Sequence, residues 1–118
     1  DALYDLYGFK DDYFIYSNRG NLSKAFYDDL FVVECDKPFV CFYLKDKKFL
    51  VQCTLDNVAK SLKEYFIQVN RQIIVNMKHV ERIVCQQASY WVMMKNGAQY
   101  KISERREKAV RDAYCLYV

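Results

Sequence analysis

The sequence predicts a mainly β domain with flanking helices. Aromatic residues make up 17% of the chain, chiefly eleven Tyr and eight Phe, and such side chains favour the pleated, half-buried surface of a sheet. Short β-prone runs alternate with turn residues, and only two stretches of the chain have helical spacing. Because helices do not separate these runs in a regular βαβ order, a parallel sheet is disfavoured and antiparallel strands are expected.

Five strands are predicted in the first half of the chain, at residues 13–17, 22–26, 30–35, 39–44 and 49–53. Asn18-Arg19-Gly20 predicts a hairpin turn after the first of them, because Asn and Gly tolerate positive φ. Asp36-Lys37-Pro38 ends the third strand, and the charged residues 45–48 predict the turn between the last two.

Residues 1–12 mix acidic side chains with Leu and Tyr and show no clean period. We expect them to be a linker remnant or a loosely docked N-terminal arm. Residues 13–118 are expected to form a single domain, since a chain of 118 residues suffices for one core but not for two ordinary domains. The chain starts at Asp1 rather than Met, so we expect a fragment or processed form of a longer protein.

Thr54 predicts the start of a helix, because its hydroxyl can accept a hydrogen bond from an unpaired backbone amide. The apolar residues that follow it recur at helical spacing: Leu55, Val58, Ala59, Leu62, Tyr65 and Phe66. This pattern predicts an amphipathic helix that covers a sheet.

Four more strands are predicted at residues 73–75, 80–86, 90–94 and 99–102, with Asn96-Gly97 as a hairpin turn between the last two. Ser103 predicts the start of a closing helix over residues 104–114. Its inward face is expected to hold Val110, Ala113 and Tyr114, and its outward face Arg105, Arg106, Lys108 and Arg111.

No apolar run approaches the ~20 residues that cross a bilayer, and the N-terminus has no secretory signal. The five Cys include no CxxC pair, so they match neither a disulfide framework nor a zinc ribbon. Most of them lie in or beside apolar runs, where a free Cys behaves as a small hydrophobe. We therefore expect a cytoplasmic protein with reduced core thiols, no membrane contact, no bound metal and no cofactor.

Catalysis is disfavoured. The only His is His79, and nothing in the spacing brings one of the thiols to it. No glycine-rich phosphate loop, zinc-protease motif or EF-hand loop is present. A zinc-binding or thiol enzyme is the last of the alternatives that we consider.

The net charge of +3 is unevenly distributed along the chain. Residues 1–59 carry seven Lys/Arg against ten Asp/Glu, whereas residues 60–118 carry eleven against five. A basic half on a small domain is typical of proteins that bind a polyanion, although ordinary surfaces show it too.

Two polar, basic stretches stand out in that half: Asn70-Arg71-Gln72, and residues 101–106, where a predicted strand passes into a helix. Asn, Gln and Arg carry the donor and acceptor edges that recognise adenine and guanine in the major groove. Cations beside a helix N-terminus can also engage phosphates. Composition alone favours solvated turns over such contacts.

From about Tyr13 to Tyr114 the order of these pieces resembles the LytTR family, the DNA-binding domain of many bacterial response regulators. The family's central signature, roughly F-x-R-x-H-R-S-[FYI]-[ILV]-V-N with an apolar residue four positions later, is matched by Phe66, Arg71, Ile73, Ile74, Val75, Asn76 and Val80. Its T-L-x-x-L-x-x-x-L helix is matched by Thr54, Leu55, Val58 and Leu62. Residues 30–34 resemble its I-x-[YF]-[IV]-E strand. Residues 94–97 resemble its [LIV]-x-[ND]-G turn, and residues 102–105 its [VI]-S-x-R ending.

The chain departs from the family at four of these positions. Gln68 stands where Arg is usual, Asn70 where His is usual, Gln72 where Ser is usual, and Glu104 where many members have Arg. We expect the first three to retune base or phosphate contacts and Glu104 to lower the local positive potential. A target sequence therefore cannot be transferred from other members.

The resemblance implies an elongated, mostly antiparallel β fold of small stacked sheets with flanking helices, whose loops enter the major grooves. Arg71 and Arg105 match positions that contact DNA in the family, with Asn70 and Lys101 beside them as base or phosphate partners. Lys37 matches a third contact region less closely. The predicted DNA-binding set is Lys37, Gln68, Asn70, Arg71, Gln72, Lys101, Arg105 and Arg106.

The partner that the resemblance implies is double-stranded promoter DNA with paired direct repeats about one helical turn apart. It also allows a receiver or sensor domain upstream, and it leaves a dimer on DNA open. The alternative function is a protein-interaction module whose basic face binds an acidic partner, with self-association through the Tyr-rich first strands.

Overall fold

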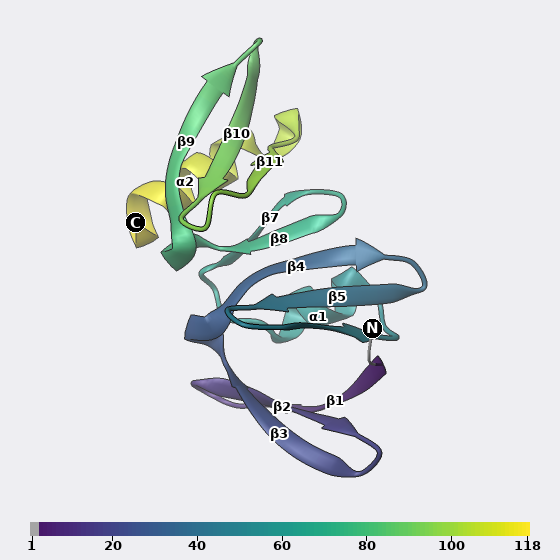
Figure 1. The fold of residues 1–118 in the computed structure, drawn as a ribbon. Helices are drawn as coiled ribbons and strands as arrows, with labels where there is room; N and C mark the ends of the chain where they lie inside the picture. The colour runs from purple at the N-terminus through teal and green to yellow at the C-terminus, as the bar shows by residue number, and fades with distance from the viewer. Residues whose placement is uncertain (1–2) are drawn as a thin grey trace. The chain divides into compact units, whose positions relative to one another are not determined.

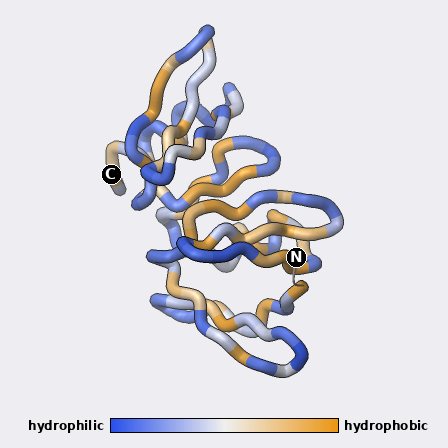
Figure 2. Tube along the Cα trace, viewed as in Figure 1, coloured by the Kyte–Doolittle hydropathy of each residue, from blue (hydrophilic) through white to orange (hydrophobic). Residues whose placement is uncertain are grey.

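The computed structural model describes residues 3–118, and strands predominate in it, with two short α-helices and three single 3₁₀ turns. The mainly β fold with flanking helices is thus confirmed. The backbone forms two compact units, residues 1–62 and 63–118, each with its own strands and one α-helix (Figure 1). Along the trace the strands are mostly hydrophobic and the turns that join them hydrophilic (Figure 2).

The first unit contains six strands and helix α1 (Leu55–Ser61). The strands are β1 (Leu3–Phe9), β2 (Tyr13–Asn18), β3 (Asn21–Phe26), β4 (Leu30–Asp36), β5 (Phe39–Leu44) and β6 (Lys48–Val51), with the 3₁₀ turn η1 (Tyr27–Asp29) before β4. Hydrogen bonds order them β3-β2-β1-β6-β5-β4. Neighbours are antiparallel except β1 and β6, which are parallel.

The turn between β2 and β3 forms as the sequence predicted. Asn18 pairs with Asn21, which leaves Arg19 and Gly20 as a two-residue turn. Both have positive φ, 53° and 82°, as the turns that match the twist of a hairpin require.

Strand β1 corrects the expectation for residues 1–12. Residues 3–9 pair with β2 and β6, so they form an ordered strand rather than a loosely docked arm; residues 1–2 lie outside the described residues. The register of β1 shifts between Leu6 and Gly8. Burial along β1 nevertheless alternates, but its exposed positions include Leu3 and Tyr7, so the residue types show no clean period. The domain boundary at residue 13 stays a prediction.

A cluster of aromatic rings forms the core of the first unit. Phe49 stacks on Tyr16 with ring centroids 4.5 Å apart and on Phe42 at 5.2 Å. Phe14 contacts all three of these rings. The four side chains are at most 2% exposed, so the high aromatic content is used in packing.

Helix α1 begins where predicted and ends earlier. The Thr54 hydroxyl accepts a hydrogen bond from the Asn57 amide at 3.2 Å, and Leu55 and Val58 are buried. The predicted continuation to Phe66 is wrong, because Leu62 is already extended and Phe66 begins a strand. The apolar residues after Ser61 therefore match helical spacing only by chance.

The second unit contains hairpin β7 (Phe66–Asn70) and β8 (Ile73–Asn76), the meander β9 (Val80–Gln86), β10 (Ser89–Met94) and β11 (Gln99–Lys101), and helix α2 (Glu107–Tyr117). The 3₁₀ turns η2 (Met77–His79) and η3 (Glu104–Arg106) precede β9 and α2. Helix α2 lies against one face of the meander and also contacts β7 (Figure 1). The Asn96-Gly97 turn forms as predicted, with Gly97 at φ 93°.

The closing helix differs in its first turn. Residues 104–106 form η3, and α2 starts at Glu107; the Ser103 side chain makes no capping bond. Val110 and Ala113 are buried as expected, whereas Tyr114 is only partly buried and donates a hydrogen bond to the Glu81 carbonyl at 3.2 Å. Arg106 was expected to face outward but is half-buried. A 3₁₀ turn has fewer residues per turn than an α-helix, which shifts the side chains relative to the predicted faces.

Phe49→Ala should lower the free energy of unfolding by about 3–5 kcal/mol, because it opens a cavity among three buried rings. Urea unfolding measures this. Phe26→Ala removes the same side chain from a position that is 49% exposed, and should cost no more than about 1 kcal/mol. Equal losses of unfolding free energy in the two variants would show that Phe49 is not part of the core.

Candidate nucleic-acid interface

The tip of the β7–β8 hairpin presents an arginine to solvent. Arg71 and Gln72 form the turn between the strands, and both are exposed. Asn70 pairs with Ile73, and the register of β7 shifts between Gln68 and Asn70. The apolar residues of β8 are buried. The tip therefore projects polar side chains from a strand that is anchored in the core.

Two side-chain amides brace this tip from within. The Asn70 Oδ1 accepts a hydrogen bond from the Gln72 amide at 2.9 Å. The Gln68 Nε2 donates to the Asn70 carbonyl at 3.0 Å and lies 3.5 Å from the Arg71 carbonyl. Both residues were predicted to face DNA, and the structure shows the Gln68 Nε2 and the Asn70 Oδ1 engaged with the hairpin's own backbone.

A second segment, residues 101–106, lies beside the hairpin. The Ser103 amide donates to the Val69 carbonyl at 2.9 Å, and the Asn70 Nδ2 donates to the Lys101 carbonyl at 2.8 Å. The side chains of Lys101 and Arg105 are exposed on this segment. Thus Arg71, Lys101 and Arg105 stand on two segments that hydrogen bonds join.

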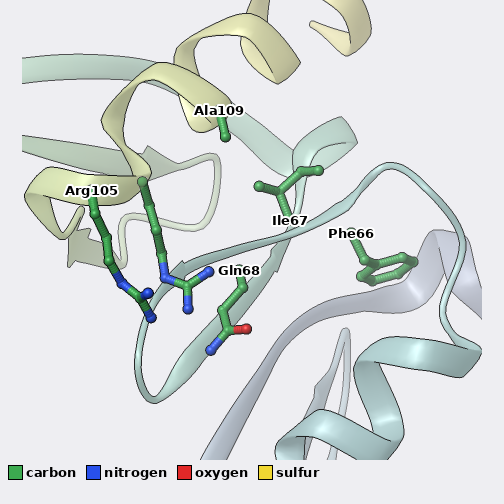
Figure 3. A pocket seen from close by; sticks show the side chains of 6 residues that line it. Phe66, Ile67, Gln68, Arg105 and Ala109 are labelled. Carbon is green, nitrogen blue, oxygen red and sulfur yellow. The ribbon is translucent and has the colours of Figure 1, made fainter.

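A shallow open groove separates β7 from the start of α2. It is lined by Phe66, Ile67, Gln68, Arg105, Arg106 and Ala109. Figure 3 shows the side chains of Arg105 and Gln68 extending in the same direction, from the turn before α2 and from β7. The Arg106 Nε is buried and has no hydrogen-bond partner among the described residues. The lining thus combines the side chains of two arginines with those of Phe66, Ile67 and Ala109.

Lys37 belongs to the first unit. It is exposed in the two-residue turn between β4 and β5, where Asp36 pairs with Phe39. The structure thus places seven of the eight predicted residues in the second unit and leaves Lys37 in the first.

Sequence patterns missed Val69 and Ser103, which join the two segments alongside Asn70. Val69 contributes only its carbonyl, and Ser103 was expected to cap a helix rather than to donate to β7. A backbone atom carries no residue-type signal. The one available hint was the position of Ser103 in the [VI]-S-x-R pattern.

Among residues 3–118, no three His, Cys, Asp or Glu side chains gather closely enough to hold a metal ion. Burial raises the pKa of the Cys41 and Cys53 thiols, which keeps them protonated and unreactive at neutral pH. Cys85 and Cys115 are exposed. In the same part of the chain, no helix is long and apolar enough to cross a membrane.

Comparison with known proteins agrees with the sequence resemblance. The sequence pattern of the LytTr DNA-binding domain matches residues 21–114, about four-fifths of the chain. Among solved structures, the chain is similar to a LytTr DNA-binding domain from Bacillus cereus, described as part of a methyl-accepting/DNA response regulator. The TM-score is 0.74 at 15% identity, over 88% of this chain and 97% of that domain. A comparison with curated proteins found no match.

Alkylation at pH 8 should label Cys85 and Cys115 well before Cys41 and Cys53. The first two are exposed, whereas burial raises the pKa of the other two above the ordinary value of a thiol, so less thiolate is present. Peptide mapping by mass spectrometry follows each site. Labelling of all four in denaturant is the control, and early labelling of Cys41 in the native chain would show that the buried thiols are accessible.

Proposed function

The chain belongs to the LytTR family of DNA-binding domains, and we propose that it binds specific sites in promoter DNA as the output domain of a bacterial transcriptional regulator. The family is one of DNA-binding domains rather than of enzymes. The observation that carries the proposal for this chain is the pair Arg71 and Arg105, both exposed on joined segments of one unit.

Arg71 and Arg105 are the proposed base-reading residues. A guanidinium can donate two parallel hydrogen bonds to the O6 and N7 atoms of guanine, which is the commonest specific contact in the major groove. Arg71 projects from a two-residue tip, narrow enough to enter a groove. Loops rather than a recognition helix would then read the major grooves.

Gln72 and Lys101 are proposed as neighbouring contacts. Gln72 is exposed beside Arg71, and its side-chain amide can pair with adenine. Lys101 carries an exposed cation that can neutralise a phosphate. The groove between β7 and α2 would bring Arg105 and Arg106 to the same DNA backbone. Gln68 adds a further polar group to the lining of this groove.

The larger arrangement follows the family. We propose paired direct repeats about one helical turn apart as the binding site, occupied by two copies of the chain, and a receiver or sensor domain upstream in the full-length protein. Such a regulator acts in the cytoplasm. The net charge of the second unit supports a polyanionic partner, since residues 63–118 carry ten Lys/Arg against five Asp/Glu.

Arg71→Ala and Arg105→Ala should each weaken binding to a selected duplex by about 1–3 kcal/mol, roughly 5- to 150-fold, and relax specificity at one base position. The duplex is selected from a random pool by the unaltered chain, and fluorescence anisotropy over a salt series measures affinity. Binding of the unaltered chain should fall steeply with salt, because phosphate contacts release counterions.

Arg82→Ala is the matched control, because it removes one exposed positive charge from β9 in the same unit. It should lower affinity only slightly for all sequences alike. Affinity that is independent of salt, or that survives the combined Arg71→Ala and Arg105→Ala change, would contradict the proposal. Specific capture of an acidic protein without duplex binding would favour the interaction-module alternative.

Lys37→Ala tests the third contact region. If this exposed lysine contacts a phosphate, the substitution weakens binding about equally across sequences and lowers the slope of log affinity against log salt by about 1. Lys24→Ala, on exposed strand β3, removes the same charge elsewhere in the first unit. An unchanged slope for Lys37→Ala would remove it from the contact set.

A further inference from the structure

We propose that Asn70 is a positioning residue that sets the spacing of Arg71 and Arg105, rather than a residue that contacts bases. The inference rests on the proposed function, since it concerns how the same site reads DNA. It replaces the expectation that Asn70 is a base or phosphate partner.

The Asn70 side chain makes two bonds with different consequences. Its Oδ1 accepts from the Gln72 amide at 2.9 Å, which holds the Arg71-Gln72 turn closed. Its Nδ2 donates to the Lys101 carbonyl at 2.8 Å, which ties that turn to a strand 31 residues further along the chain. One small side chain therefore connects the tip that carries Arg71 to the segment that carries Arg105.

A backbone bond runs parallel to this connection. The Ser103 amide donates to the Val69 carbonyl at 2.9 Å, and the Ser103 hydroxyl lies 3.5 Å from the same oxygen. Val69 itself is fully buried. The bonds of Asn70 and Ser103 thus join consecutive residues of β7 to both ends of a three-residue stretch, 101–103. Two such links resist rotation of one segment about the other, which a single link would allow.

Rigid spacing matters because a bidentate contact tolerates little misplacement. Two guanidinium groups that read bases on one duplex must both reach hydrogen-bonding distance at once. If the two segments moved independently, binding through one arginine would leave the other arginine mobile. Ordering that second arginine would cost additional conformational entropy. Because Asn70 already holds the two segments together in the free protein, less entropy is lost when DNA binds.

Asn70→Ser and Asn70→Ala separate the two bonds without adding charge. The Ser hydroxyl can still accept from the Gln72 amide, as in a serine turn, but it is too short to reach the Lys101 carbonyl. The Ala side chain makes neither bond. Hydrogen exchange in the free protein should show faster exchange of the Ser103 amide in both variants and of the Gln72 amide chiefly in Asn70→Ala. The Ala98 amide, which Asn96 holds in the same manner at 3.0 Å, is the internal control.

A double-mutant cycle with Arg105→Ala then separates positioning from direct contact. On the selected duplex, Asn70→Ser should weaken binding about 2- to 12-fold, the range expected for one ordinary hydrogen bond. In the Arg105→Ala background the same change should cost less than about twofold, because no second arginine remains to be positioned.

The remaining outcomes overturn the proposal. An equal loss in both backgrounds would show a direct contact or a general loss of structure, and unchanged affinity would show that the link is irrelevant to binding. Unchanged exchange at Ser103 would show that Asn70 does not couple the segments. If the unaltered chain selects no duplex at all, the proposed function fails, while the exchange measurement still decides whether the coupling exists.

Discussion

Hairpin β7–β8 cannot hold its shape alone, because two isolated strands are at most marginally stable in water. Its buried strand, Ile73–Asn76, and the contacts of α2 with β7 supply the missing support. Asn76 is the one fully buried polar residue of the described core, and its Oδ1 accepts from the Lys78 amide at 2.9 Å, which pairs that amide where the chain leaves the hairpin. The position of Arg71 thus depends on the packing of the buried strand β8. A core substitution in this unit would alter DNA binding without touching any contact residue.

The strands and turns that could be predicted are those with short-range signals. The turn at Arg19-Gly20 has positive φ at two positions, and Gly20 adopts it without steric cost. Thr54 needs only an amide three residues away. Strand β1 lacked such a signal because the apolar residues Leu3 and Tyr7 stand at exposed positions, so residue type does not follow burial there. The end of α1 was missed for a related reason: apolar residues after Ser61 fit a helix by spacing but belong to the next strand and the turn before it.

The sequence could predict which residues of the candidate site are charged and exposed. It could not predict which contacts hold them in place. Arg71, Lys101 and Arg105 are exposed cations in polar stretches, so residue type and neighbourhood identify them. The placement of Arg106 depended on the phase of a helix whose first turn is 3₁₀, and that turn rotates the side chain into a half-buried position. The bracing by Gln68 and Asn70 could not be anticipated, because their partners are backbone carbonyls and amides. Amides such as these appear in a sequence as DNA-reading groups, although the same donor and acceptor edges serve equally well to hold a turn.

The residue at position 70 also determines how the link responds to pH. An amide side chain carries a donor and an acceptor that do not titrate, so Asn70 can make both of its bonds over the whole range in which the fold is stable. A neutral imidazole, the usual group at this position in the family, also has one donor and one acceptor, but it loses the acceptor when it is protonated. With an unperturbed pKa near 6.5, a His at the tip would release the Gln72 amide as the pH falls while adding a positive charge beside the phosphates. Those two effects act in opposite directions on DNA binding, the first by loosening the tip and the second by attracting the polyanion. Asn70 carries neither effect, so its link between the two segments does not change with pH.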